Sequence, residues 1–368
     1  MNISEKNLKN EERASFALRS LYAKYGYSQY KMGKFEEYDL YVRNKDFLIS
    51  DGVITFTDTN GRLMALKPDV TLSIIKNCKD EAGTVQKMYY NENVYRVSGN
   101  TNSFREIMQV GLECIGDIDS YCVSEVVMLA ARSLMTVSDE WVLDISHIGI
   151  LTEAMDALGL DSDTTREIIK CVGEKNLHEA TRICGDGDAA KTLLSLITTY
   201  GSARDVLDKL RTLKVNPTYI KELEDIVAAL DLCGLSKNLR IDFSVVDDIK
   251  YYNGIVFKGY VHGVPSSILS GGRYDNLMKR MGKRAGAIGF AVYLDLLEFL
   301  SEKSERYDVD TLILYDGNEP ALNVSRAVAR ICDSGASAIA QRKIPEKLRY
   351  KKLLKLKDGE VTVLEDNA

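Results

Sequence analysis

The sequence predicts an α+β fold in which an antiparallel sheet is flanked by helices and interrupted by a helical insertion. Helix-like segments alternate with strand pairs up to about residue 147, nearly continuous helix follows to residue 236, and strand-like segments then resume. Helices inserted between two halves of one sheet explain this return of the strand pattern. We therefore expect four segments: a first part of the core, the insertion, a second part of the core and a truncated α/β tail, at residues 1–149, 150–236, 237–305 and 306–368.

The first part of the core begins with a helix. Residues 10–26 have apolar side chains at helical spacing, and Gly26 offers a stop. Residues 27–41 look extended, and residues 54–68 read as a hairpin in which Asn60 and Gly61 suit a type I′ turn. A helix then starts at Pro68 and Asp69. The remaining elements of this part are expected to be a strand pair (residues 85–97 and 103–116), a helix (119–137) and a strand (140–150).

The later segments follow the same reasoning. Six helices are expected in the insertion, separated by short Gly or Asp breaks. Strands are expected at residues 240–246, 251–261 and 286–293, with a Gly-rich stretch over 266–282 and a helix after 293. The tail alternates strand, helix and strand. It also contains a basic run, residues 342–357, which we interpret as a solvated helix face rather than an RNA-binding surface.

Composition and charge exclude several classes of function. The chain has 368 residues, of which 45% are hydrophobic and 28% charged, and its net charge is −6. Ordinary globular values exclude disordered and collagen-like chains. A negative chain is not expected to bind nucleic acid over its whole surface. No run of about 18 apolar residues occurs and the first residues are polar, so we expect no membrane span and no secretory signal.

The cysteines and histidines indicate a reducing compartment and no metal chemistry. The seven cysteines are scattered, odd in number and without a C-x-x-C pair. We therefore expect reduced, mostly buried thiols and a cytoplasmic location. The three histidines are far apart, so no metal site is expected, and nothing in the chain calls for a cofactor.

Two clusters of polar residues are candidates for a binding site. Gln109, Gly111 and Glu113 share one face of a predicted strand, where buried polar groups are costly unless they bind something. The alternative is a solvent-facing strand. The second cluster joins Tyr251 and Tyr252 to the stretch Gly271-Gly272-Arg273-Tyr274, where backbone can approach a ligand closely. Alone, the glycine pair is only a turn signal.

Five ordered segments resemble histidyl-tRNA synthetases, over roughly residues 10–300. LMALKPDVTLSI resembles the segment that opens with Arg-Pro-Glu-Gly-Thr, and VYRV with SFREIMQVGLECIG resembles the second signature motif of class II aminoacyl-tRNA synthetases. YYNGIVF, LSGGRYDNLM and AIGFAVYLDLLEFL resemble the histidine-specific motifs and the third class II motif. The resemblance implies a class II synthetase-like antiparallel sheet, usually dimeric, that holds ATP and histidine on its open face.

The resemblance also implies a histidine pocket. Carboxylates attract an ammonium group, while Glu113 and tyrosyl hydroxyls can hydrogen-bond both imidazole nitrogens. Arg96 matches the arginine of the second motif. It either joins the pocket, holds a phosphate or pairs with Glu106, Glu113 or Asp119, and for Arg105 such a structural pair is expected. The expected histidine-binding residues are Asp69, Thr71, Arg96, Gln109, Glu113, Tyr251, Tyr252 and Tyr274.

Departures from the synthetase pattern argue against adenylation. Ser98 stands where the family has a glutamate, Asp247 replaces the catalytic arginine, and Leu296 replaces the arginine that grips the γ-phosphate. Loss of one preorganised donor costs about 3–4 kcal/mol of transition-state stabilisation, and reversal of its charge costs more. Lys250 is a poor substitute because it lacks the guanidinium fork. The tail is also too short to complete an anticodon-binding domain, so tRNA binding is not expected.

A synthetase-like chain that has a histidine pocket but lacks the adenylating cations resembles the regulatory subunits of ATP phosphoribosyltransferase. This resemblance implies a protein without catalytic activity of its own that forms a homodimer, associates with the short-form catalytic subunit, and supports activity and histidine feedback inhibition in the first step of histidine biosynthesis. The alternatives are a divergent histidyl-tRNA synthetase, a synthetase-like protein that binds RNA or another enzyme, and a synthetase-like protein without a ligand.

Overall fold

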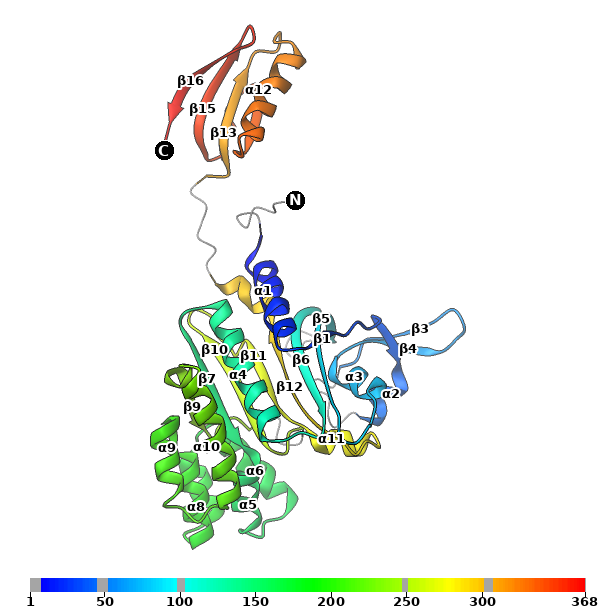
Figure 1. The fold of residues 1–368 in the computed structure, drawn as a ribbon, viewed down its shortest axis with the longest axis vertical. Coiled ribbons are helices and arrows are strands. Elements are labelled where there is room, and N and C mark those ends of the chain that lie inside the picture. Colours follow the sequence, from blue (N-terminus) through cyan, green and yellow to red (C-terminus); the bar gives the residue numbers. More distant parts are fainter. Residues whose placement is uncertain (1–7, 45–51, 98–102, 247–250, 301–306, 368) are drawn as a thin grey trace. The chain divides into compact units, whose positions relative to one another are not determined.

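The protein divides into two compact units, residues 1–300 and 301–368. The structure is a computed structural model that describes residues 8–44, 52–97, 103–246, 251–300 and 307–367. Ser98 and the segment Asp247–Lys250, which enter the sequence argument against adenylation, lie outside the described residues. Figure 1 shows the course of the chain.

A nine-stranded sheet forms the centre of the first unit (Figure 1). Its strands, in spatial order, are β1 (Ser28–Gln29), β5 (Val85–Val97), β6 (Phe104–Gly116), β12 (Gly286–Tyr293), β11 (Leu269–Arg273), β10 (Ile255–Val261), β7 (Trp141–His147), β9 (Leu239–Asp242) and β8 (Tyr200–Ser202). The pairs β1–β5 and β7–β9 are parallel and the other neighbours are antiparallel. The predicted α+β class is confirmed, and the sheet flanked by helices is mostly antiparallel with two parallel pairs.

Helices α1 (Asn10–Lys24) and α4 (Ser120–Val137) pack against this sheet. The carboxylate of Asp119 accepts a hydrogen bond from the Cys122 amide at 2.8 Å and caps α4. Among the described residues, α4 is the helix long and apolar enough to cross a membrane by length and composition, but 56% of it is buried inside the fold. The apolar character of α4 follows from its place in the core, where it packs on the main sheet.

The segment between β7 and β9 is mainly helical, and α10 packs against α4. Strand β7 ends at His147 and a helix begins at the next residue, so the expected strand over residues 140–150 is too long at its end. The short strand β8, which joins the edge of the main sheet, was not expected. The helices are α5 (Ile148–Asp156), α6 (Ser162–Gly173), α7 (Leu177–Cys184), α8 (Asp188–Ile197), α9 (Ala203–Leu210) and α10 (Pro217–Leu232).

A small antiparallel sheet in the order β2-β4-β3 lies beside helices α2 and α3. Its elements are β2 (Phe35–Glu37), α2 (Tyr38–Arg43), β3 (Thr55–Thr57), β4 (Leu63–Leu66) and α3 (Thr71–Asn77). Two expectations are wrong here. Residues 38–43 are helical rather than extended. The loop between β3 and β4 is not a type I′ turn. Such a turn needs a positive φ at both central residues, whereas in this loop only Gly61 has one (79°), and its amide donates to the Asp58 carbonyl.

The second half of the core adds short helical elements to its strands. Residues 271 and 272 lie within β11, where they pair with β12, so the glycine pair is part of a strand rather than a turn. The helix expected after residue 293 is a 3₁₀ helix. These elements are η3 (Ser236–Asn238), α11 (Asp275–Arg280) and η4 (Leu294–Phe299).

The C-terminal unit is a four-stranded sheet with one helix. Its strands lie in the order β14-β13-β15-β16, where β13 is parallel to both neighbours and β15 pairs antiparallel with β16. The elements are β13 (Val309–Tyr315), α12 (Ala321–Asp333), β14 (Ala338–Gln341), β15 (Tyr350–Lys357) and β16 (Glu360–Asp366). The interpretation of the basic run as a helix face is wrong, because its second half is strand β15, in which Leu353, Leu354 and Leu356 are buried.

All seven cysteines are free thiols, and four of them are buried. Two are exposed: Cys233 in the first unit and Cys332 in the second. The expectation that most of the thiols are buried agrees with this arrangement.

Candidate functional site

The expected histidine-binding residues lie around one pocket on the main sheet. The pocket has a volume of about 460 Å³, including the space at its mouth. Strands β5, β6, β11 and β12 supply its base, while Thr71 is the first residue of α3 and Asp69 lies two residues before it. Its lining consists of Asp69, Thr71, Tyr90, Arg96, Gln109, Glu113, Tyr251, Tyr252, Ser270, Tyr274, Gly289, Phe290, Ala291 and Tyr293.

The alternation of β6 explains why this face of the sheet is polar. Val110 and Leu112 are packed in the core that contains α4, whereas Gln109 and Glu113 point to the opposite face. Gln109 is 3% exposed and Glu113 is 2% exposed. The alternative of a solvent-facing strand is therefore wrong. Burying these groups costs free energy that hydrogen bonds inside the pocket must offset.

Glu113 is the best-supported polar group of the pocket. Its Oε1 accepts a hydrogen bond from the Thr71 hydroxyl at 2.7 Å, and its Oε2 accepts one from the Tyr274 hydroxyl at 2.5 Å. Burial raises the pKa of Glu113 from 4.5 to about 8, although both hydrogen bonds act in the opposite direction. The carboxyl group is thus poised to lose a proton near neutral pH when a positive charge comes near it.

Asp69 provides a second carboxylate at the same wall. It is 8% exposed, and its Oδ1 accepts a hydrogen bond from the amide of Leu72 at 2.9 Å, in the first turn of α3. Burial raises the pKa of Asp69, while this amide and the nearby guanidinium of Arg96 lower it. Two buried carboxyl groups on one side make the pocket attractive to an ammonium group.

Tyrosine rings form another wall. The ring of Tyr251 lies 4.8 Å from that of Tyr252 in an edge-on arrangement and 5.7 Å from that of Tyr274 in a tilted one. These rings are at most 9% exposed, and burial raises the pKa values of Tyr251 and Tyr274 well above 10. The phenols therefore stay neutral. They offer flat apolar faces together with hydroxyl groups that can hydrogen-bond a ligand.

Glycines on the sheet leave room for these side chains. A Cβ atom built on Gly289 would lie 1.8 Å from Oε2 of Glu113, and one on Gly272 would lie 2.7 Å from Cδ1 of Tyr252. Neighbouring strands bring Gly289 opposite both Glu113 and Gly272. A larger residue at either position would therefore displace a pocket side chain.

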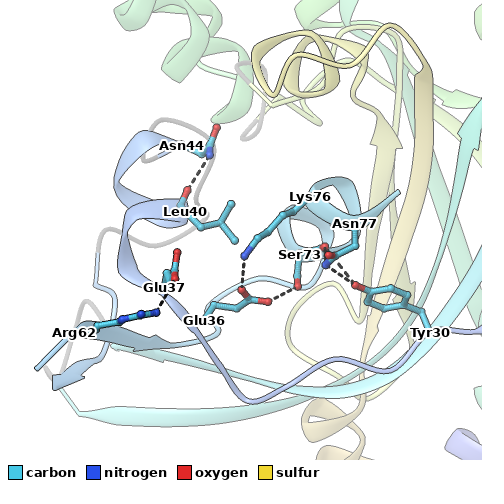
Figure 2. Close-up of polar contacts among 9 residues, drawn as sticks. All are labelled: Tyr30, Glu36, Glu37, Leu40, Asn44, Arg62, Ser73, Lys76 and Asn77. Carbon is cyan, nitrogen blue, oxygen red and sulfur yellow. Dashed lines mark hydrogen bonds and ion pairs between the residues drawn. The ribbon is translucent and has the colours of Figure 1, made fainter. Parts of the chain in front are cut away.

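A network of polar contacts fixes α3, whose first residue is Thr71 (Figure 2). The Glu36 carboxylate on β2 accepts from the hydroxyl of Ser73 at 2.8 Å and from the ammonium of Lys76 at 3.0 Å. On the other side, the Asn77 amide donates to the hydroxyl of Tyr30 at 3.0 Å. Figure 2 shows Glu36 and Tyr30 approaching α3 from two sides. Glu36 of the small sheet and Tyr30 thus hold the helix that places Thr71 at the pocket.

Several lining residues were not among the expected ones, notably Tyr90, Ser270 and Tyr293. Tyr90 lies opposite Gly111, and Tyr293 lies opposite Gln109. The alternation of β5 was a usable signal for Tyr90 once the register with β6 was known. Tyr293 could be assigned to the pocket only from the register between β12 and β6, because its local sequence does not distinguish it from other strand residues.

The structure places Arg96 and Arg105 in different surroundings. Arg96 lines the pocket, but its Nε donates to the Pro68 carbonyl at 2.9 Å. Arg105 is exposed and contacts Asp295 at 3.5 Å, so the expected pairing with Glu106, Glu113 or Asp119 is wrong. Leu296 is half-buried against the main core. Arg96 is therefore the one cation among the described residues that line the pocket.

This geometry suits a small cationic molecule with a polar ring. Asp69 and Glu113 complement an ammonium or an imidazole N–H, and the tyrosines can enclose a flat ring.

Comparisons with known proteins give one consistent result. A sequence profile described as "Histidyl-tRNA synthetase" matches residues 2–297. The chain is 30% identical to a protein named ATP phosphoribosyltransferase regulatory subunit from Clostridium novyi, over 76% of this chain and 69% of that protein. It is 28% identical to the protein of the same name from Ruminiclostridium cellulolyticum, over 85% of this chain and 79% of that one.

Solved structures show the same fold. The structure of an ATP phosphoribosyltransferase regulatory subunit/histidyl-tRNA synthetase from Bacillus halodurans matches with a TM-score of 0.76 at 22% identity, covering 96% of this chain and 99% of that one. The ATP phosphoribosyl transferase (HisG:HisZ) complex from Thermotoga maritima contains a chain that matches with a TM-score of 0.62 at 18% identity, covering 77% and 97%.

Proposed function

The chain belongs to the ATP phosphoribosyltransferase regulatory subunits, within the histidyl-tRNA synthetase family, and from this premise we propose that it is the histidine-sensing, non-catalytic partner of a short-form catalytic subunit. The single observation that carries the sensing role is the pocket itself. Its carboxylates and tyrosines match what histidine requires, while Arg96 is its one described cation.

The proposed contacts follow from the chemistry of histidine. Asp69 and Gln109 receive the ammonium group, and Glu113 accepts a hydrogen bond from an imidazole N–H. Tyr251, Tyr252 and Tyr274 enclose the ring, Thr71 holds Glu113 in place, and Arg96 faces the carboxylate of the ligand. Support for this assignment comes from the position of all eight residues in one lining.

Titration calorimetry of the full chain with free histidine tests the assignment. We expect binding, and we expect Glu113→Gln to weaken it at least tenfold, because a charged acceptor is replaced by a neutral one. Glu81→Gln, a change at an exposed carboxylate that forms an ion pair 3.9 Å long, is the matched control and should bind as the parent does. No histidine binding, or equal binding by both variants, contradicts the sensor.

A lack of adenylating activity is the second part of the proposal. It rests on Leu296 in the described residues, on Asp247 in the sequence, and on the name shared by the curated relatives. Histidine-dependent exchange of pyrophosphate into ATP is the measurement. We expect no exchange above background, whereas turnover at an enzymatic rate would identify a divergent synthetase instead.

Feedback requires that histidine bind two arrangements of the complex with unequal affinity, because only differential affinity shifts their populations. We expect the chain to co-purify with the short-form catalytic subunit and to be needed for its full activity. In that complex, histidine should inhibit the parent strongly and the Glu113→Gln variant weakly.

Self-association completes the proposal. Phe35 and Phe56 on the small sheet are 57% and 37% exposed, and their rings lie 5.2 Å apart, which supports an apolar contact surface. Light scattering should give the mass of a dimer. The double variant Phe35→Ser/Phe56→Ser should shift it toward a monomer. The cytoplasmic location stays a prediction.

A further inference from the structure

The sheet of the C-terminal unit is only partly covered by its helix. Helix α12 packs against β13 and β14. On β15, Leu354 and Leu356 are buried, and their partners across the strand pair are Val363 and Val361. Directly opposed residues share a face of a sheet. The two valines therefore lie on the face of the core leucines, yet Val361 is 45% exposed and Val363 is 60% exposed.

A groove runs between α12 and this uncovered strand, with a volume of about 1080 Å³ that includes open solvent. Its apolar part consists of Ala327, Ile331, Leu354 and Val361. The other lining residues are Asn323, Arg326, Arg330, Gly359 and Glu360. An apolar floor beside polar walls is the usual composition of a docking surface.

The end of the groove is held in a fixed form. The Glu319 carboxylate accepts hydrogen bonds from the amides of Asp358 at 2.7 Å and Gly359 at 2.8 Å, and from the side-chain amide of Asn323 at 2.8 Å. These contacts tie the β15–β16 turn to the start of α12. A partner would therefore meet a surface that is already formed.

The groove is lined by two arginines and one carboxylate, that of Glu360, so its charge favours an acidic partner. Arg326 and Arg330 are exposed and stand one helical turn apart on α12. Within the described parts of the chain, neither makes an ion pair. Unpaired guanidinium groups at this spacing complement carboxylates at positions i and i+4 of a facing helix. The apolar floor complements the apolar side of the same helix.

We propose that this groove docks an acidic amphipathic helix of the catalytic subunit. The inference rests on the proposed function for the identity of the partner. A helix laid over β15 and β16 would cover Val361 and Val363 and complete a two-layer α/β unit. Its carboxylates would pair with Arg326 and Arg330.

The affinity of the full chain for the purified short-form catalytic subunit tests the inference. We expect Arg326→Glu/Arg330→Glu to weaken binding at least tenfold, and Val361→Asp to weaken it similarly. The control is Lys343→Glu/Lys347→Glu, which makes the same change in charge on the exposed β14–β15 loop and should alter affinity less than twofold. Circular dichroism checks that each variant is folded.

Amide hydrogen exchange on the unmodified chain gives a second readout. The catalytic subunit should slow exchange in residues 360–366. Unchanged exchange there, or a charge-reversal variant that binds like its control, overturns the inference and leaves the proposed function standing. A chain that does not bind the catalytic subunit at all overturns the proposed function as well. A third outcome concerns RNA. If the parent chain retains tRNA at physiological salt, the arginine variant does not, and both bind the catalytic subunit equally, the groove is an RNA surface and the inference is overturned.

Discussion

Oε2 of Glu113 occupies the space that a side chain at position 289 would need, because a Cβ atom built on Gly289 would lie 1.8 Å from it. The same oxygen accepts the hydrogen bond of Tyr274 at 2.5 Å. The position of the acid in the pocket therefore depends on the absence of a side chain on the neighbouring strand.

Gly289→Ala should damage both the fold and the pocket. The new methyl group must push Glu113 away from Tyr274, and overpacking of this kind costs about 1–3 kcal/mol. Urea denaturation measures the loss of stability, and calorimetry should show at least a tenfold loss of histidine affinity. Gly33→Ala is the control, since a Cβ atom there would make only an ordinary contact of 3.5 Å. Equal behaviour of both variants would contradict the close approach.

Stability should fall as pH rises toward 8. The pKa of Glu113 is about 8 in the folded chain, against 4.5 for an ordinary glutamate. Between these values the folded state holds a proton that the unfolded state has lost, so the free energy of unfolding decreases with rising pH. This contribution is complete below pH 4.5 and lost above pH 8. Denaturation from pH 6 to 8.5 should show the decrease, and Glu113→Gln should flatten it relative to the parent.

Glu36→Gln should weaken ligand binding with little effect on the fold. Glu36 is the acceptor for Ser73 and Lys76, so the change loosens α3 and with it Thr71. We expect a threefold to tenfold loss of histidine affinity. The adjacent Glu37 contacts Arg62 at 3.8 Å through side chains that are both more than 60% exposed, and Glu37→Gln is expected to change nothing (Figure 2). If the two variants bind histidine alike, α3 is not held by Glu36.

Lys67→Met should be strongly destabilising. The Lys67 side chain is 1% exposed, and its Nζ lies 2.5 Å from Oε2 of Glu92. The substitution would leave the Glu92 carboxylate without this ion-pair partner. Breaking a buried pair on one side costs about 3–5 kcal/mol, whereas Lys67→Met/Glu92→Gln should cost less. Denaturation of the single and double variants gives the coupling energy. Lys79→Met, at a pair with 76% and 62% exposed side chains, is the control and should cost under about 0.5 kcal/mol.

Much of the fold could be predicted because the strong signals are local. The long strands β5 and β6 match the expected ranges closely, and Asp119 caps α4 where the sequence places its start. The failures occur where tertiary contacts outweigh local preference. Residues 38–43 form a helix although their sequence looks extended, and Tyr41 is fully buried there. The lysine-rich strand β15 is stabilised by β13 and β16 on its two sides.

Turn chemistry explains one further difference. Asn60-Gly61 has the composition of a type I′ turn without its backbone, whereas Asp358 and Gly359 both have positive φ values, 53° and 82°. The second pair therefore makes the tight hairpin between β15 and β16. That Asp-Gly signal was present in the sequence and would have predicted the hairpin.

The pocket residues could be predicted by type but not by arrangement. The resemblance to the synthetases predicted Asp69, Glu113 and the tyrosines as pocket residues, and all of them line one pocket in the structure. Tyr293 and the close approach of Gly289 to Glu113 depend on the register between β6 and β12. Register is a property of strand pairing, which residue composition alone does not determine.

The two exposed thiols have a practical consequence. Cys233 lies in the first unit and Cys332 in the second, while four of the other five cysteines are buried. Maleimide dyes should therefore react first at these two positions, once Cys184 is replaced by serine. Energy transfer between the dyes would report the distance between the two halves of the molecule, with and without histidine, in single particles in solution.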